Sequence, residues 1–150
     1  MNPTAKIHKF LIDYFQADDI VKTVTLSKTV DIDQNQSNIY QLVNLDLTSS
    51  NIVEQAVNFT FVITALQQRD TLNTNYDSKL LTDTNYLSNM NETHFVFNRF
   101  LNVLIKQESD VYLVSSSDLR PLREFQRQNL DGWQTTIVFQ VVNDVPSCNI

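Results

Sequence analysis

The stretch at 53–67, VEQAVNFTFVITALQ, decides the fold because it alternates apolar and polar side chains more regularly than any other part of the chain. Its core-forming members occupy every second position: Val57, Phe59, Phe61, Ile63 and Ala65. A period of two places successive side chains on opposite faces of a β-strand. The stretch therefore predicts a long strand with one buried face and one semi-polar face, part of which projects beyond the sheet.

The patterns on either side of this strand predict the remaining elements. Apolar residues spaced by three and four indicate helices over 3–15 and 89–107, the second with a capping pair formed by Asn89 and Glu92. Alternation and β-branched residues predict further strands at 20–30, 40–47, 111–114 and 133–141, with a break at 49–51. Helices and strands that are only partly intermixed predict an α+β fold, with a mostly antiparallel sheet and both helices packed on one face.

The length of 150 residues fits a single domain over 1–150. The polar segment at about 69–89 is long for a simple connection, and it predicts a functional excursion from the domain body. The only Gly and the only Trp, Gly132 and Trp133, adjoin at the start of the last strand. Gly132 is expected to supply an unusual backbone angle there, and Trp133 is expected to enter the core.

Composition excludes several classes of function. A net charge of −6 argues against a surface that coats nucleic acid, although it suits a wall past which DNA moves without binding. The opening residues have no signal-peptide pattern, and no apolar run is long enough to span a membrane. The single Cys148 has no internal disulfide partner, which predicts synthesis in a reducing cytoplasm.

No motif for catalysis or cofactor binding stands out, so we predict a protein that is not an enzyme and has no catalytic, cofactor-binding or metal-binding residues. Asp31 and Asp33 form an isolated acidic pair that lacks the glycine and distal glutamate of a calcium loop. His8, His94 and Cys148 are too few for a zinc site. One glycine cannot build a phosphate-binding loop, and the serine run at 115–117 has no nucleophile elbow.

An arginine cluster within 120–128 is the clearest candidate for an interaction surface. Arg120, Arg123 and Arg127 recur every three to four residues, interleaved with Leu122 and Phe125. The segment is expected to be a loop with a helical turn. A solvated face is the plain interpretation, and a protein interface is the sharper one, because arginine is enriched at interfaces and forks onto carboxylates.

Four segments together resemble a known group of proteins: VKTVTLSK with DID at 21–33, YQLVNLDL at 40–47, Asn91-Glu92-Thr93, and the closing LRPLREFQRQNLDGWQTTIVFQVVNDVPSC at 119–148. The chain is similar to small virion proteins of tailed bacteriophages, and its element order resembles tail-terminator or tail-completion proteins. The likeness covers nearly the whole chain, and its most specific part is the closing N-L-D-G-W and V-P-S-C pattern.

The resemblance implies a structural virion protein that forms a homo-oligomeric ring, hexameric or dodecameric, at the head–tail junction. Its partners would be other copies of itself and the adjacent tail-tube and connector or neck proteins, with DNA passing through an axial channel without specific binding. The excursion at 69–89 and the segment at 120–127 are the candidate interface elements of such a ring. The protein is expected to be made in the host cytoplasm and located in the virion neck or tail. A tail-tube or head-completion protein, or a small non-virion phage binding protein, remains the alternative.

Overall fold

The structure, a computed structural model, describes residues 2–26, 40–69, 74–77, 80–83, 85–106, 110–123 and 130–143. Its elements, in chain order, are α1 (Pro3–Gln16), β1 (Thr23–Thr25), β2 (Leu42–Val53), β3 (Ala56–Gln68), β4 (Thr74–Asp77), β5 (Leu80–Asp83), α2 (Tyr86–Ile105), β6 (Val111–Ser116), β7 (Arg120–Leu122) and β8 (Leu130–Val142). The predicted acidic pair Asp31 and Asp33, and Cys148, lie outside the described residues.

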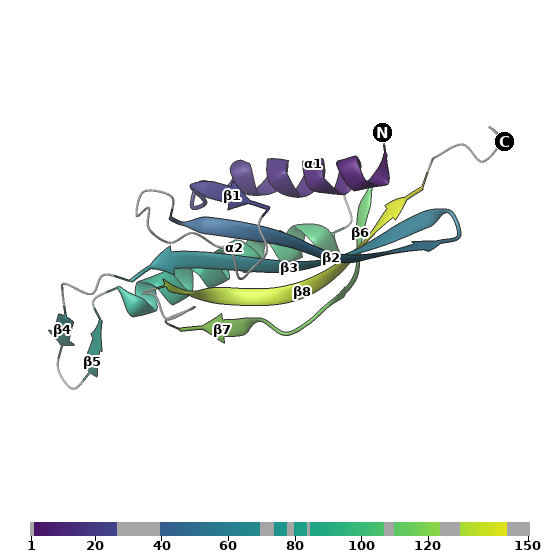
Figure 1. The fold of residues 1–150 in the computed structure, drawn as a ribbon. Coiled ribbons are helices and arrows are strands. Elements are labelled where there is room, and N and C mark those ends of the chain that lie inside the picture. Colours follow the sequence, from purple (N-terminus) through teal and green to yellow (C-terminus); the bar gives the residue numbers. More distant parts are fainter. Residues whose placement is uncertain are drawn as a thin grey trace.

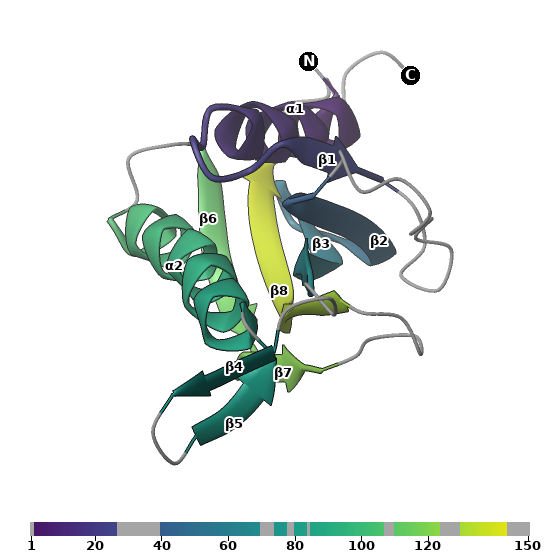
Figure 2. The ribbon, with the colours of Figure 1, turned by 90° about the vertical axis from the view of Figure 1, so that its left-hand side faces the viewer.

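Six strands form one sheet in the order β1-β2-β3-β8-β6, and β7 pairs with β8 beside β6. Only the β1–β2 pair is parallel, and every other pair in the sheet is antiparallel. Both helices lie against the same face of the sheet (Figures 1 and 2). The predicted α+β class, with a mostly antiparallel sheet and two helices on one face, is therefore confirmed.

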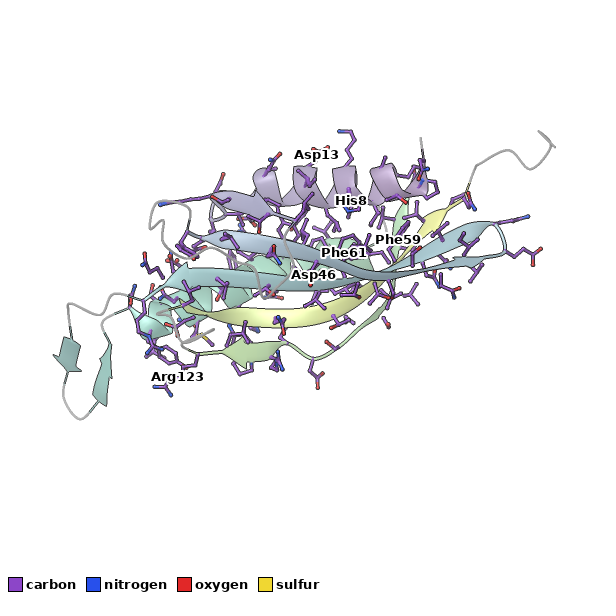
Figure 3. All side chains as sticks on the ribbon, in the orientation of Figure 1. His8, Asp13, Asp46, Phe59, Phe61 and Arg123 are labelled. Atoms are coloured by element: carbon purple, nitrogen blue, oxygen red, sulfur yellow. The ribbon has the colours of Figure 1, made fainter. Side chains whose placement is uncertain are left out.

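The alternation at 57–65 produces the buried face of β3. Its apolar residues join alternate residues of β8 and the inward stripes of α1 and α2 in a single cluster. Phe59 and Phe61 lie beneath α1, and the ring of Phe61 meets those of His8 and Phe139 edge-on (Figure 3). Burial of this apolar surface is the main force that holds the helices on the sheet.

Helix α1 begins as its sequence predicts. Pro3 occupies the first turn, and the Asn2 side chain caps the helix by accepting a hydrogen bond from the Thr4 backbone N–H at 2.9 Å. Ile7, Leu11 and Phe15 are buried against the sheet.

Helix α2 begins at Tyr86, three residues before the predicted start. The expected capping pair is therefore wrong. Asn89 lies inside the helix and is buried, whereas Glu92 accepts a hydrogen bond from the Gln41 side chain. Ile105, the last residue of the helix, is mostly exposed.

The predicted break at 49–51 is also wrong, because β2 runs through it to Val53 with only a register shift between Leu47 and Ser49. The chain turns at Glu54–Gln55, where Gln55 has a φ of 62°, and returns as β3. The resulting hairpin extends past the N-terminal end of α1 (Figure 1). The long alternating stretch thus includes a turn that the pattern alone did not reveal.

Gly132 is required for a reason other than the predicted one. No glycine has a positive φ. A Cβ at Gly132 would instead lie 1.8 Å from the Ala65 carbonyl oxygen on the neighbouring β3. The residue therefore permits a close approach of two strands, which any side chain would block.

Candidate subunit interface

The predicted arginine segment is only partly described. Arg120 and Leu122 lie in β7, which pairs with the start of β8, so the expected helical turn is wrong for these residues. Arg123 follows directly after the strand. Phe125 and Arg127 lie outside the described residues.

The described members of the segment point in different directions. Arg120 is exposed, and its guanidinium donates a hydrogen bond to the Gln134 side-chain oxygen. Leu122 is only 8% exposed and packs with Leu42, Leu66 and Leu130 in a second, smaller cluster. In this arrangement the Leu122 side chain stabilises its own subunit and is not presented to a partner.

Arg123 is exposed and lies at the end of the molecule beside the β4–β5 hairpin (Figures 1 and 3). Its guanidinium carbon is 4.8 Å from the centre of the Tyr86 ring, and that of Arg69 is 5.1 Å from the same centre. Each cation is attracted by the electron-rich ring. Tyr86 therefore orients one exposed arginine while it also contacts a buried one.

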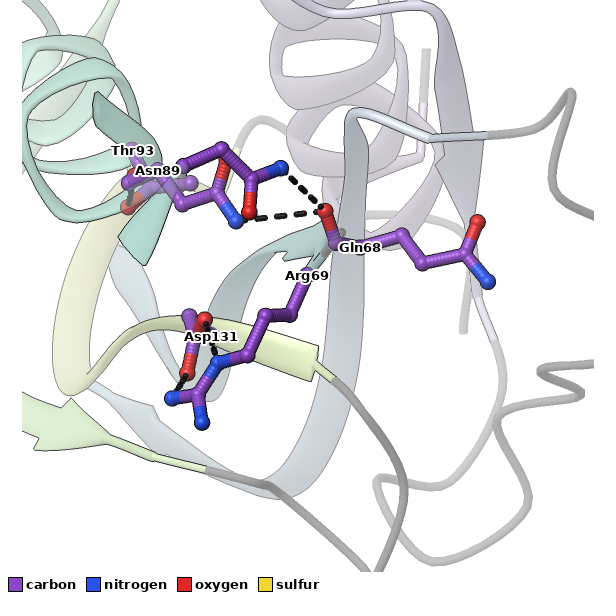
Figure 4. A network of polar contacts seen from close by, with 6 residues as sticks. Gln68, Arg69, Asn89, Thr93 and Asp131 are labelled. Atoms are coloured by element: carbon purple, nitrogen blue, oxygen red, sulfur yellow. Dashed lines mark hydrogen bonds and ion pairs between the residues drawn. The ribbon is translucent and has the colours of Figure 1, made fainter. Parts of the chain in front are cut away.

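Arg69 forms the strongest contact at this end. Its Nε and Nη2 donate to the two carboxylate oxygens of Asp131 at 2.9 and 2.6 Å, a forked pair that is almost fully buried (Figure 4). A forked guanidinium–carboxylate pair has a fixed geometry, and removal of one partner would leave a buried charge. The pair therefore fixes the end of β3 to the start of β8.

Two amides reinforce the same corner. The side chains of Asn85 and Asn89 both donate to the Gln68 carbonyl oxygen, at 3.1 and 3.2 Å (Figure 4). These contacts tie the start of α2 to the end of β3 and close the base of the predicted excursion at 69–89. Between these anchors the chain forms the separate hairpin β4–β5.

The two segments predicted as interface elements therefore meet in space. The excursion leaves the body at Arg69 and returns at Asn85, and Arg123 lies across Tyr86 from that base. The sequence indicated both segments but not their contact. Arg69 resembles a solvated charge after a strand, and nothing in the pattern pairs it with Asp131 over 62 positions.

A groove of about 710 Å³ runs beside Arg120. It is lined by the connection between β6 and β7 and by residues of β3 and β8, including Val62, Gln134 and Thr136. Arg120 is the positively charged residue of its lining, and Asp118 is the negatively charged one. Arg120 therefore lies at the β7 edge of the sheet, next to residues on the face opposite the helices.

The two histidines make ordinary packing and hydrogen-bond contacts. His8 bonds the Thr4 carbonyl oxygen at 2.7 Å through Nδ1, and His94 packs edge-on against Trp133 with ring centres 5.1 Å apart. Among the described residues, no three His, Cys, Asp or Glu side chains gather where they could hold a metal ion.

Compared with known proteins, the chain matches no protein-family model and no curated protein sequence. The resemblance to phage tail terminators therefore stays a prediction. No helix in the described ranges is long and apolar enough to cross a membrane.

Proposed function

We propose that this chain is a structural protein of a tailed-phage virion. It would be a subunit of a tail-terminator or neck ring at the head–tail junction, built around an axial channel for DNA. The observation that carries the proposal is the meeting of the two predicted interface segments at one end of the sheet, around Tyr86, Arg123 and the Arg69–Asp131 pair.

A ring needs a contact that repeats from each subunit to the next. Identical subunits that meet head-to-tail close into a ring when the rotation permits. A rigid base under the excursion suits such a contact, because a fixed geometry sets the rotation angle. Arg123 and Arg120 would contact carboxylates of the neighbour, while the excursion reaches over it.

The charge of the chain supports the same role. At a net −6 the protein repels the phosphates of DNA, so a channel wall made from it would let the duplex slide. Neighbouring tail-tube and connector proteins would contact the two open faces of the ring. The interface would carry the function, and no catalytic residue is required.

The ring at the head–tail junction has two alternatives. A tail-tube or head-completion protein would use the same kind of ring contact at another level of the virion. A small non-virion phage binding protein is favoured by the groove beside Arg120, which has the size and the cation to hold a peptide carboxylate.

Electron microscopy of the purified protein, together with quantitative mass spectrometry of virions from the phage that encodes it, tests the proposal. We expect closed rings and a copy number equal to one or two rings per particle. A monomeric protein that is absent from virions would contradict the ring and favour the binding protein. A copy number far above one ring layer would favour the tail tube.

A further inference from the structure

The face of the sheet opposite the helices is a broad surface that the proposed ring contact uses only at one edge, where Arg120 pairs with Gln134. Strand register places four open rows on it that cross the strands: Asp46, Val62 and Thr136; Ser49, Thr60, Val138 and Ser115; Asn51, Asn58, Gln140 and Tyr112; Val53, Ala56 and Val142. The next row on the same side, Asn44, Thr64, Gln134 and Arg120, is left out because Asn44 and Thr64 are buried and Arg120 belongs to the proposed ring contact. We call the four open rows the helix-free face. No described helix or strand covers it, and its residues are half-buried or exposed.

The helix-free face is nearly without charge. Asp46 is its only acidic or basic residue, although 19% of the chain is charged. The rest are amides, hydroxyls, small apolar residues and one tyrosine. Depletion of charged residues, with tyrosine retained, distinguishes the core of protein interfaces from ordinary surface.

The chemistry of the face makes it complementary to itself. Asn, Gln, Ser and Thr side chains each donate and accept hydrogen bonds, so any two can pair in either direction. Gln140 and Asn58 already pair in this way across two strands, at 3.2 Å. A two-fold contact brings the same patch of each subunit together, which requires such self-matching groups.

We propose that two copies of this chain pack against each other through their helix-free faces. A second copy is favoured because the face is complementary to itself, and because two molecules of charge −6 approach at the lowest electrostatic cost where the surface is neutral. Four strands and four rows give a footprint of about 500 Å² per copy, or about 1,000 Å² in total, which reaches the lower range of specific interfaces. Sheets pack face to face in this way about 10 Å apart.

This contact goes beyond the proposed ring. It uses a surface that borders Arg120 but does not include Arg120, Arg123 or the excursion, and it joins subunits by a two-fold axis rather than head-to-tail. It would hold even if the chain belonged to no virion.

The test introduces like charge at the centre of the face. In the variant carrying Thr60→Arg and Val138→Arg, two cross-strand neighbours become cationic. The control carries Ala5→Arg and Asn98→Arg on the exposed sides of α1 and α2. By light scattering with size-exclusion chromatography and by sedimentation, we expect the face variant to weaken self-association by at least about tenfold, because like charges at an interface cost several kcal/mol. The control should associate as the wild type does.

A crosslinking experiment gives a readout that does not depend on charge. In a Cys148→Ser background, Thr60→Cys should form a covalent dimer with a flexible bismaleimide, whereas Asn98→Cys should not. Circular dichroism would verify that each variant is folded.

A wild-type protein that is monomeric at all concentrations overturns this proposal. So does an oligomer that Thr60→Arg with Val138→Arg leaves intact, or a Thr60→Cys protein that forms no covalent dimer. If Thr60→Arg with Val138→Arg leaves the oligomer intact and Arg123→Glu disrupts it, the ring proposal stands and the two-fold contact is wrong.

Discussion

The two faces of β3 differ in what surrounds them, although they are built from the same thirteen residues. Phe59, Phe61 and Ile63 point toward the helices and are almost completely buried. Thr60 and Val62 lie between them in sequence, point the other way, and stay half-buried. Thr64 and Leu66, farther along on that same side, are buried. The helix side therefore contributes most of the free energy of folding, and the opposite side is open only over residues 56–62.

The largest effect that this comparison predicts is on the covered face. Phe61→Ala should lower the free energy of unfolding by about 3–5 kcal/mol, because it removes a buried aromatic ring and leaves a cavity. Thr60→Ala, one residue away on the helix-free face, should change it by less than about 0.5 kcal/mol. Urea denaturation of both variants measures this. Similar losses for the two would show that the two faces are not distinct.

A second pair of residues makes the same contrast among the arginines. Arg69→Ala should cost about 3 kcal/mol, because Asp131 would keep a buried charge without its forked partner. Arg123→Ala should cost under about 1 kcal/mol, since an exposed guanidinium loses only its contact with Tyr86. Thermal and urea denaturation compare the stabilities of the two variants. An Arg69→Ala protein as stable as the Arg123→Ala protein would show that the buried pair does not fix this end of the sheet.

Substitutions of Trp133 should cause losses of stability between these extremes. Its ring packs against the main cluster but is only partly buried, and its indole N–H donates to the Met90 carbonyl oxygen at 2.9 Å. Trp133→Phe keeps much of the ring and loses the hydrogen bond, so we expect a loss of about 1 kcal/mol. Trp133→Ala should cost about 2–3 kcal/mol. Equal costs for the two substitutions would assign the whole effect to the hydrogen bond.

The parts of the fold that could be predicted are those that follow from local periodicity. Alternation over 57–65 assigned the buried face of β3 correctly, and spacing by three and four assigned the stripe of α1. The turn at Gln55 was missed because it carries none of the usual turn residues, and the neighbouring stretch of Ser and Asn drew the predicted break instead. The start of α2 was displaced because Asn89 resembles a cap, whereas its amide serves the end of β3.

The candidate interface was predictable only in part. Clustering of charge indicated Arg120 and Arg123, and polarity indicated the excursion, because both are local properties of the sequence. The contacts among Arg69, Tyr86 and Asp131 join elements far apart along the chain, so they depend on tertiary pairing that composition does not encode. Leu122 illustrates the same limit, since its burial depends on the pairing of β7 with β8.

We propose that Arg120, Arg123 and Arg127 form the ring contact, whereas the buried contacts stabilise the fold. Replacing Arg120, Arg123 and Arg127 with Glu should change the free energy of unfolding by less than about 1 kcal/mol, because Arg120 and Arg123 are exposed and exposed ion pairs contribute little to stability. A control with Lys9, Lys22 and Lys106 changed to Glu makes the same change in net charge on other exposed surfaces.

The decisive measurement is the copy number of each variant in purified virions, determined by mass spectrometry after complementation of a phage that lacks the gene. We predict that the arginine variant is folded and absent from particles, whereas the lysine variant is present at the wild-type copy number. An arginine variant that enters virions at the wild-type copy number would contradict the account.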